Sequence, residues 1–571
     1  MRWHVNVLST QLTERTTITN KMIDLHVHST YSDGTYTVEE LVDYAVEKGL
    51  KAIALTDHDT VDGLDEIIEY AKGKPIEVIP GIEFSTEYEG KDVHIVGLYI
   101  DYKGETFKTW LRDFVDSRVT RNKKICIKLT EHGCPVDYDE LVKRYPGAVI
   151  TRAHFAAFLM EKGYVKSREE AFDRYIGDNA PCFLPREKVT PKDAIRIISE
   201  AGGISILAHP VLYKMSDARL DKLVRELADE GLIGIEALYS TYTAGDVRHI
   251  KSLANQYNLL ISGGSDFHGA NKPKIDLGTG HGSLEIPDEI LDNLKKCLAY
   301  YVFSDMDGTL FDEKCVFSDA LKDSIRGFVE RGNFLVPTTG RPYKGTINAF
   351  IENDMVLPDM KVICSNGALI IDVETETPVI EFKLTSEEIR EVIKKADELG
   401  IYVHSYDDDN IVLREETEET RFYTRKVHMP LKFVEDIADE LKDGALKLMC
   451  IDLNNKPKLE AFRTWIHENM GDRLQGIFSN DRYMEVLSVK AGKGNGIKAF
   501  CRLNHIPIGR TYACGDQEND IDMIKAAGCG VAVANATAEA KAAADVITKD
   551  DASHDALKPL FDSIILPMYS K

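Results

Sequence analysis

The stretch Asp24-Leu-His26-Val-His28 places one carboxylate and two imidazoles at alternating positions near the start of the chain. In an extended strand successive side chains point to opposite faces, so Asp24, His26 and His28 share one face. Two imidazoles on one face form half of a metal site, and the carboxylate of Asp24 can orient one of the rings. Asp33 follows in a turn rich in serine and glycine. Two half-buried strand histidines without a metal are the alternative.

The length and charge of the chain exclude several classes of protein. A chain of 571 residues is too long for one hydrophobic core, so about two to four domains are expected. The net charge of −24 argues against binding duplex DNA, which needs a basic surface, but is compatible with a small phosphorylated ligand held by cations. The 10 cysteines include no Cys-x-x-Cys pair, which favours a reducing, cytoplasmic compartment.

No apolar run in the sequence approaches the length of a membrane span, so no membrane contact is expected. Residues 1–21 lack the apolar centre of a signal peptide and are predicted to be a disordered extension. Translation from Met1 and from Met22 are both compatible with this reading.

The first half of the chain alternates predicted helices with short apolar strands, and polar residues follow these strands. This alternation predicts parallel βα units, whose strands carry active-site residues at their carboxyl ends. Nine candidate metal ligands lie on these strands or at their ends: His26, His28, Asp33, His58, Glu83, His94, His209, Asp266 and His268. Imidazoles and carboxylates without thiolates favour Mn, Fe or Zn, and the set is larger than one ion needs. Sites with several metals bind and polarise phosphate esters.

The motifs DLHVHSTYSDG, LTDHDT, GIEFS, VHIVGL, TRAHF, LAHP and GSDFHG follow one another along this half. Through them residues 22–300 resemble the PHP (polymerase and histidinol phosphatase) metallo-phosphoesterases. The resemblance is greatest to the branch that removes the 3′-phosphate of nucleoside 3′,5′-bisphosphates and trims short RNA from its 5′ end. It implies a distorted β/α barrel and a site for about three ions of Mn²⁺, Fe or Zn.

The resemblance also implies how the ligands are shared. One ion would be held by His26, His28, Glu83 and Asp266, a second by Glu83, His94 and His209, and a third by Asp33, His58 and His268. Arg152 and His154 of the TRAHF motif would face the substrate phosphate, since a guanidinium suits bidentate contacts. The alternatives are a surface salt bridge for Arg152 and metal ligation for His154. Asp57 and Asp59 are expected to support ligands or to face solvent.

In the second half, an apolar strand ends in Asp305 and Asp307, and further polar clusters follow at residues 338–341, 365–367, 490–494 and 515–520. In an open α/β sheet such strand ends converge on one crevice. Two carboxylates, a hydroxyl, a lysine and an acidic metal platform suit phosphoryl transfer through an aspartyl-phosphate.

The motifs DMDGTL, TTGR, Lys493-Gly494 and GDQEND make residues 301–571 resemble the haloacid dehalogenase (HAD) superfamily phosphatases of the Cof-like branch. The resemblance implies a Rossmann-like core with an α/β cap inserted at about residues 382–478. It makes Asp305 the nucleophile and Asp307 the general acid/base. It places Thr339, Gly340, Lys493 and Asn519 at the substrate. It assigns Mg²⁺ to Asp305, the Asp307 carbonyl and Asp516, with Asp520 as support.

The sequence therefore predicts an α/β protein with two metal-dependent phosphatase domains. The first would act on a nucleotide, with short RNA as a further substrate class, and the second on a small phosphorylated metabolite. A histidinol-phosphate phosphatase in the first half is a narrower alternative. Alternatively, one half could be a non-catalytic ligand sensor that regulates the other. The intact motifs of both halves argue against this alternative. The sequence leaves open the metabolite, the native metal, the oligomeric state and any coupling between the sites.

Overall fold

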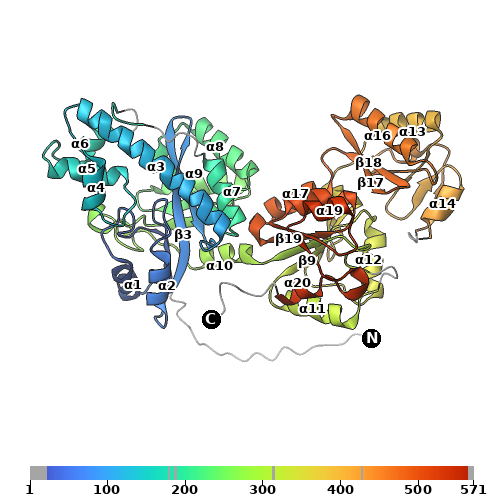
Figure 1. The fold of residues 1–571 in the computed structure, drawn as a ribbon, viewed down its shortest axis with the longest axis horizontal. Coiled ribbons are helices and arrows are strands. Elements are labelled where there is room, and N and C mark those ends of the chain that lie inside the picture. Colours follow the sequence, from blue (N-terminus) through green and yellow to red (C-terminus); the bar gives the residue numbers. More distant parts are fainter. Residues whose placement is uncertain (1–21, 178–179, 185–189, 312–315, 426–428, 564–571) are drawn as a thin grey trace, which may run out of the picture.

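The computed structural model describes residues 22–177, 180–184, 190–311, 316–425 and 429–563, so the expected disordered extension at residues 1–21 lies outside the described residues. The chain forms two lobes, and an outlying part stands apart on the C-terminal lobe (Figure 1). Strands and helices are mixed in both lobes, which confirms the predicted α/β class.

A seven-stranded sheet with its strands in sequence order forms the centre of the N-terminal lobe. Its strands are β1 (Ile23–Val27), β2 (Ala52–Leu55), β3 (Glu77–Tyr88), β4 (Lys91–Leu98), β5 (Ile204–Leu207), β6 (Gly234–Tyr239) and β7 (Leu260–Gly264). A bridge between Val27 and Phe267 brings the two edges together, so the sheet is nearly closed. The barrel-like sheet that the family resemblance implied is confirmed.

One strand departs from the expected parallel arrangement. β4 pairs antiparallel with both β3 and β5, whereas the remaining neighbours pair in parallel. Glu89 and Gly90 have positive φ values of 48° and 80°, so the chain reverses in a tight turn instead of crossing over through a helix. As a result β3 runs for 12 residues, and Glu83 lies in its middle instead of at the expected strand end.

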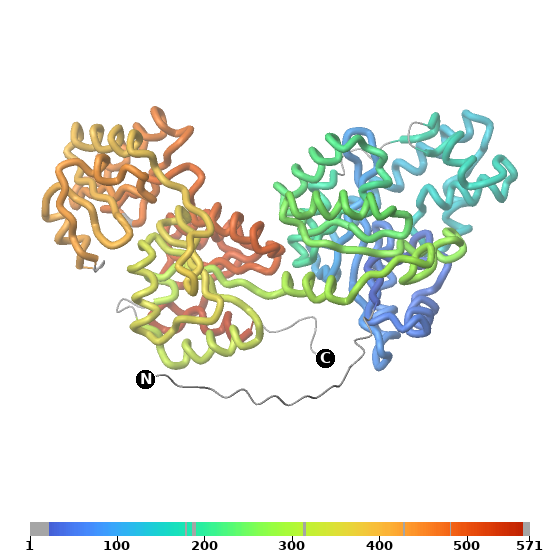
Figure 2. Tube along the Cα trace, turned by 180° about the vertical axis from the view of Figure 1, so that it is seen from behind, coloured from blue at the N-terminus to red at the C-terminus, as the bar shows by residue number. Residues whose placement is uncertain are grey.

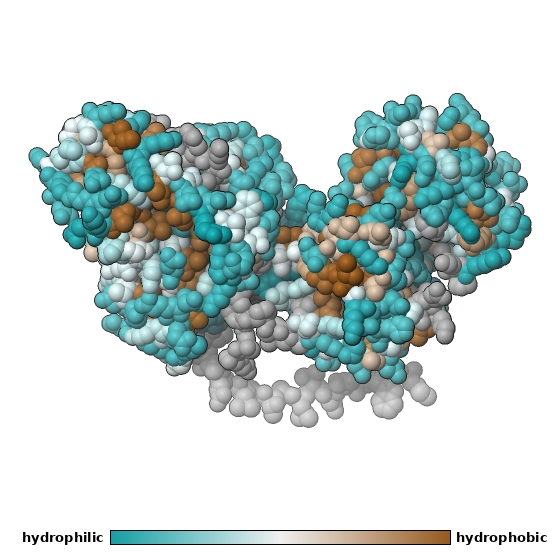
Figure 3. Space-filling view, viewed as in Figure 1, coloured by the Kyte–Doolittle hydropathy of each residue, from teal (hydrophilic) through white to brown (hydrophobic). Residues whose placement is uncertain are grey.

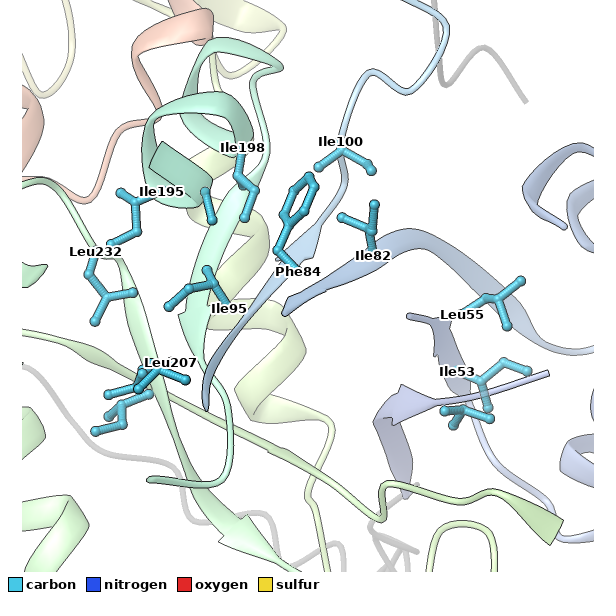
Figure 4. Packing of buried hydrophobic residues seen from close by; sticks show 14 of the residues in the cluster. Ile53, Leu55, Ile82, Phe84, Ile95, Ile100, Ile195, Ile198, Leu207 and Leu232 are labelled. Atoms are coloured by element: carbon cyan, nitrogen blue, oxygen red, sulfur yellow. The ribbon is translucent and has the colours of Figure 1, made fainter. Parts of the chain in front are cut away.

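Helix α7 (Pro191–Glu200) packs on the strands that carry Glu83 and His94. It begins with a capping box formed by Thr190 and Asp193, and Pro191 occupies the first turn. Ile195 and Ile198 of α7 lie in the same buried cluster as Phe84 of β3 and Ile95 of β4 (Figure 4). These contacts fix the two antiparallel strands relative to the rest of the barrel.

A helical segment is inserted between β4 and α7. It comprises α3 (Glu105–Glu131), α4 (Tyr138–Arg144), α5 (Arg152–Glu161), α6 (Arg168–Ala171) and η1 (Phe172–Ile176). Its own apolar cluster, which includes Ile125, Phe155 and Leu159, holds the helices together. Some buried side chains of α3 face the barrel, and Arg118 contacts Asp59 there.

The C-terminal lobe has a five-stranded parallel sheet in the order β21-β20-β19-β8-β9. The strands are β8 (Tyr301–Ser304), β9 (Phe334–Pro337), β19 (Thr511–Gly515), β20 (Cys529–Ala532) and β21 (Val546–Ile547). A small antiparallel sheet of β10 (Lys361–Cys364), β11 (Leu369–Asp372) and β12 (Thr377–Glu381) adjoins it. Parallel strands in a non-consecutive order, with β8 between β19 and β9, confirm the predicted Rossmann-like core.

The outlying part of this lobe, which we call the cap, is seen from behind in Figure 2. It contains a six-stranded sheet. Its strands are β13 (Tyr402–Tyr406), β14 (Ile411–Leu413), β15 (Leu431–Phe433), β16 (Leu448–Ile451), β17 (Leu474–Asn480) and β18 (Tyr483–Ser488). The helix α13 (Ser386–Leu399) also belongs to the cap. β18 pairs with both β16 and β17, so the cap continues to Ser488, and the expected boundary at residue 478 cuts through a hairpin.

The two lobes meet where α7 ends and where the chain approaches β19. The Ile508 amide donates to Ser199 Oγ at 2.8 Å, and Arg510 Nε donates to the Gly202 carbonyl at 3.0 Å. A Cβ atom at Gly509 would lie 2.3 Å from the Glu200 carbonyl oxygen, so this close approach requires glycine. The junction therefore joins the lobes through hydrogen bonds between backbone and side-chain groups and through a close approach of the backbone at Gly509.

Most of the surface in view is hydrophilic, with apolar side chains in small separate groups on both lobes (Figure 3). Within the described ranges, no helix combines the length and the apolar character needed to cross a membrane.

Candidate active sites

Glu83 lies at the centre of a histidine cluster in the N-terminal barrel. Its Oε1 is 2.8 Å from Nδ1 of His94 and 3.0 Å from Nε2 of His209. Its Oε2 is within 3.3 Å of a ring nitrogen of three more histidines: His26, His28 and His58. Glu83 itself is buried. One carboxylate from β3 thus contacts five of the predicted ligands, which come from four other parts of the sheet.

The remaining predicted ligands complete the same cluster. Asp33 Oδ1 is 3.2 Å from Nε2 of His268 and 3.8 Å from Nε2 of His58. Asp266 Oδ1 is 3.4 Å from Nε2 of His28. The structure therefore brings all nine side chains together, although they are spread over residues 26 to 268 of the sequence.

The donor atoms of this cluster fit divalent metal ions. Four groups have ligand atoms within 4.8 Å of one another: His28–Asp33–His58–His268, His26–Glu83–His209, His26–His28–Asp266 and His58–Glu83–His94. These groups divide the ligands differently from the expected partition, since His94 is grouped with His58 and His209 with His26. Within the described part of the chain, several buried ligand atoms have no hydrogen-bond partner: His26 Nε2, His28 Nε2, Asp33 Oδ1, His58 Nδ1 and His209 Nδ1. Converging buried lone pairs of this kind are compensated by a cation.

The pKa values of the cluster shift in both directions. For His28, burial lowers the pKa, but the carboxylates of Asp266 and Glu83 outweigh it and raise the pKa to about 9. Glu83 and His268 shift toward the forms that bind a metal. Burial raises the pKa of Glu83, but the surrounding imidazoles of His58, His94 and His26 outweigh it and hold the pKa well below its usual value. Burial lowers the pKa of His268 to about 4, with Lys272 adding to the effect. An ionised carboxylate and a neutral imidazole are the forms that bind a metal.

The carboxylate that orients an imidazole is Glu236, and the prediction that Asp24 does so is wrong. Glu236 Oε1 is 2.9 Å from Nδ1 of His26, and its Oε2 accepts a hydrogen bond from the His209 amide at 2.7 Å. Asp24 instead accepts backbone amides of Ser265 and Gly278, both at 2.8 Å, because the chain after β7 turns back over β1. Glu236 could have been found as one more carboxylate on a predicted strand.

A cavity of about 290 Å³ opens beside the cluster. Five cationic side chains line it together with ligands of the cluster: Arg118, Arg121, Arg152, Arg168 and Lys272. Arg152, the predicted phosphate contact, lies in this wall and donates from Nη2 to Asp92 Oδ2 at 2.6 Å. Arg152 thus lies beside the cluster in a largely buried salt bridge, and its contact with a substrate phosphate stays a prediction.

His154 has a different surrounding from its predicted neighbour Arg152. It is buried, its Nδ1 accepts a hydrogen bond from the Thr151 amide at 3.0 Å, and burial lowers its pKa to about 4. Thr151 Oγ1 in turn donates to Asp33 Oδ2 at 2.9 Å. These contacts make His154 part of the capping box at the N-terminus of α5, and this capping box supports Asp33 of the cluster.

The arginines at positions 118 and 121 were not predicted from the sequence. The buried face of α3 includes Phe107, Phe114 and Ile125, and the arginines occupy positions of the same face. Arg118 Nε donates to Asp59 Oδ2 at 2.7 Å. The sequence did contain a signal for these arginines, because they interrupt an apolar stripe at helical spacing.

Both acidic neighbours of His58 are buried and bonded, so the solvated alternative for them is wrong. Asp59 pairs with Arg118, as described, and also accepts the Ser85 amide at 3.0 Å. Asp57 accepts the Ser29 amide at 2.8 Å and the Ser32 hydroxyl at 2.5 Å. The two aspartates therefore support the loops that carry ligands.

A second acidic cluster lies at the carboxyl end of the C-terminal sheet. Asp305 follows β8, and Lys493 Nζ, at the start of α17 (Lys493–Leu503), is 2.5 Å from Asp305 Oδ1 and 2.6 Å from Asp520 Oδ1. Oxygens of Asp305, Asp516 and Asp520 lie within 4.8 Å of one another. Burial and then the neighbouring Asp520 raise the pKa of Asp516 to about 6. An oxygen-only donor set with such repulsion fits Mg²⁺.

The other predicted residues of this half follow the carboxyl ends of β8, β9 and β19. Asp307 is exposed, and its Oδ2 accepts a hydrogen bond from Arg341 Nε at 2.7 Å. Thr339 Oγ1 accepts a hydrogen bond from the Arg341 amide at 3.1 Å. Asn519 contacts Asn366, with its Nδ2 at 3.1 Å from Asn366 Oδ1. Arg341 and Asn366 had been given no role from the sequence, although both follow predicted strands.

Comparison with known proteins covers each half separately. Residues 24–175 match the model of the PHP domain, and residues 302–558 match that of a haloacid dehalogenase-like hydrolase. A 5′-3′ exoribonuclease of Haemophilus influenzae is 38% identical over 43% of this chain and 90% of that protein. A 3′,5′-nucleoside bisphosphate phosphatase of Chromobacterium violaceum is 31% identical over 45% of this chain and 90% of that protein. A solved haloacid dehalogenase-like hydrolase from Bacteroides thetaiotaomicron has 23% identity and a TM-score of 0.43, covering 47% of this chain and 100% of that one.

Proposed function

The chain belongs to the PHP family through its N-terminal half and carries a haloacid dehalogenase-like hydrolase domain in its C-terminal half, and we propose that each half holds a separate phosphatase centre. The observation that carries this proposal is the pair of clusters around Glu83 and Asp305, which share no residue. A phosphoric ester hydrolase with two active sites follows from the two domains together.

In the N-terminal centre, the nine clustered side chains would hold about three divalent ions, as four-coordinate sites with shared ligands require. Such ions, when bound, supply Lewis-acid polarisation of a phosphate ester and acidify water. The chain's own residues orient this centre. Glu236 fixes the ring of His26, and Tyr239 donates its hydroxyl proton to Asp266 Oδ2 at 2.5 Å. The cationic wall of the cavity binds the negative charges of the substrate.

The substrate we propose for this centre is a nucleoside 3′,5′-bisphosphate, with short RNA as a related class. Its two phosphates need two anion sites. The metal-ligand cluster offers one, and the guanidinium groups of Arg118, Arg121, Arg152 and Arg168 on the cavity wall offer the other. Relatives named for a bisphosphate phosphatase and for a 5′-3′ exoribonuclease support this choice.

In the C-terminal centre we propose covalent catalysis on a small phosphorylated metabolite. An oxygen of Asp305 attacks phosphorus, the bond to the leaving oxygen breaks, and Asp307 gives that oxygen its proton. Water then attacks the phosphorus of the aspartyl-phosphate and Asp307 takes a proton from it. The bond between phosphorus and the Asp305 oxygen breaks, inorganic phosphate leaves, and the Asp305 carboxylate is restored. Lys493, which contacts Asp305 directly, offsets the charge of the transferring group, and Arg341 holds Asp307 at the site.

Metal content provides a direct test of the N-terminal centre. After desalting, elemental analysis is expected to find about three ions of Mn, Fe or Zn per chain, because nine donor side chains converge there. Removal of these ions by a chelator should abolish hydrolysis of the bisphosphate, and added Mn²⁺ should restore it. Full activity in protein that contains almost no transition metal would exclude the proposed centre.

Replacing Arg152 with alanine tests the anion site on the cavity wall. A charged hydrogen bond lost from the substrate costs about 1.5–3 kcal/mol, so kcat/KM for 3′-phosphoadenosine 5′-phosphate should fall roughly ten- to a hundredfold. A small aryl phosphate, which lacks the second phosphate, should be affected much less. Arg144→Ala, which removes an exposed arginine paired with Glu161, is the matched control. Equal losses on both substrates would show that Arg152 does not bind the second phosphate.

A further inference from the structure

A buried ion pair in the cap contacts the loop of the C-terminal core that carries Thr339. Lys447 lies directly before β16, and Glu485 lies on the neighbouring strand β18, opposite Met449. Lys447 Nζ is 2.8 Å from Glu485 Oε2, and the two side chains are only 1% and 3% exposed. Within the cap, Ser479 donates its hydroxyl proton to Glu485 Oε1 at 2.5 Å. The pair is therefore desolvated and held in place from the cap side.

The same ammonium group reaches out of the cap into the core. Lys447 Nζ donates a hydrogen bond to the Gly340 carbonyl at 2.6 Å. Glu485 is equally close, since a Cβ atom at Gly340 would lie 3.2 Å from Glu485 Oε1. The cap and the core thus touch at the residue that follows Thr339, and a side chain at position 340 would push against the cap.

The carbonyl groups of this loop are divided between core and cap. The Thr339 carbonyl accepts the Asn366 amide, and the Arg341 carbonyl accepts the Ser365 amide, both at 3.0 Å and both from the core. The carbonyl between them, that of Gly340, accepts from Lys447 of the cap. The Gly340 carbonyl is half-buried where the cap meets the core, so its hydrogen bond to Lys447 ties the conformation of the loop to the cap.

The loop in turn positions two groups of the proposed reaction. Thr339 is the residue that the family resemblance places at the phosphoryl group, and Arg341 holds the carboxylate of Asp307. Rotation of the peptide at Gly340 would move both. We propose, on the basis of the covalent phosphatase function, that Lys447 and Glu485 are positioning residues that hold the loop at residues 338–341 in its active form when the cap lies on the core.

The test uses the full chain with Lys447→Met and Glu485→Gln combined. These substitutions keep the size of both side chains, leave an acceptor for Ser479, and remove the donor to Gly340. We expect kcat/KM of the C-terminal phosphatase to fall about ten- to a hundredfold, as for loss of a charged hydrogen bond. The factor should be the same for acetyl phosphate and for a larger sugar phosphate, because the loop and not the leaving group is affected.

Two controls separate this role from a structural one. Lys432→Met with Glu440→Gln makes the same substitutions in a solvent-exposed pair of the cap, 2.7 Å apart, and should leave the activity unchanged. Glu485→Gln alone keeps the Lys447 donor but removes the carboxylate that holds it, so kcat/KM should lie between the values of the combined variant and the wild type. The thermal unfolding temperature of the combined variant should match that of the wild type.

Hydrogen exchange gives a readout that does not require activity. In the combined variant the amides of residues 338–341 should exchange faster, while those of β16 and β18 stay protected. A wild-type chain with no phosphatase activity would refute the proposed function but would leave this readout valid. Unchanged exchange in the loop, an unchanged kcat/KM, or a loss confined to the sugar phosphate would each overturn the positioning role.

Discussion

The Glu83→Gln variant is expected to lose at least about a thousandfold in kcat/KM for the nucleotide substrate. Glu83 contacts five of the clustered histidines, and no other carboxylate of the described N-terminal residues has as many contacts with the cluster. Glutamine keeps the size but replaces one oxygen with an amide that donates and cannot bind a cation. Losing the chemistry of a metal centre is worth several kcal/mol, which corresponds to this factor.

The measurement combines phosphate release from 3′-phosphoadenosine 5′-phosphate with elemental analysis of the same sample. Metal content should fall together with activity, while the unfolding temperature shows whether the chain stays folded. Glu47→Gln, which changes an exposed glutamate of helix α1 (Val38–Glu47), is the matched control and should behave as the wild type. A Glu83→Gln protein with full metal content and full activity would contradict the central place we give to this residue.

The Asp305→Asn variant is expected to lose at least about a thousandfold in the C-terminal reaction, since an amide oxygen is a poor nucleophile and no covalent intermediate can form. Asp305 is buried and contacts Lys493 directly, so the substitution changes the reacting group without changing its size. Rapid acid quenching with a labelled substrate should trap a phosphorylated chain in the wild type and none in the variant.

Asp323→Asn serves as the control, because Asp323 is exposed on helix α11 (Asp319–Glu330), away from the acidic cluster. It should form the same amount of labelled protein as the wild type. Labelling that persists in Asp305→Asn would mean that another residue accepts the phosphoryl group.

The sequence motifs predicted which side chains meet in each site, and the reason lies in the geometry of parallel sheets. Asp305 and Asp516 follow β8 and β19, which are neighbours in the sheet, so their carboxylates lie at the same edge. His58 and His209 likewise follow β2 and β5 of the barrel. Patterns of this kind are local, and one strand-end residue per unit is enough to reveal them.

The features that the sequence did not predict depend on long-range packing. Arg118 and Arg121 reach the cavity only because α3 crosses toward the barrel, and nothing near them in sequence belongs to the site. The reversal of β4 depends on the tight turn at Glu89 and Gly90. The end of the cap depends on pairing between β16 and β18, which lie more than thirty residues apart. Periodicity identifies strands, but their partners are set by the whole fold.

The two centres can be tested against each other in a single crossed measurement. It determines kcat/KM for a nucleoside 3′,5′-bisphosphate and for the C-terminal phosphatase substrate in the wild type, in Glu83→Gln and in Asp305→Asn. Because the two clusters share no residue, we expect Glu83→Gln to lose only the first activity and Asp305→Asn only the second. If either substitution abolishes both activities in a chain that remains folded, the account of two separate phosphatase centres is wrong.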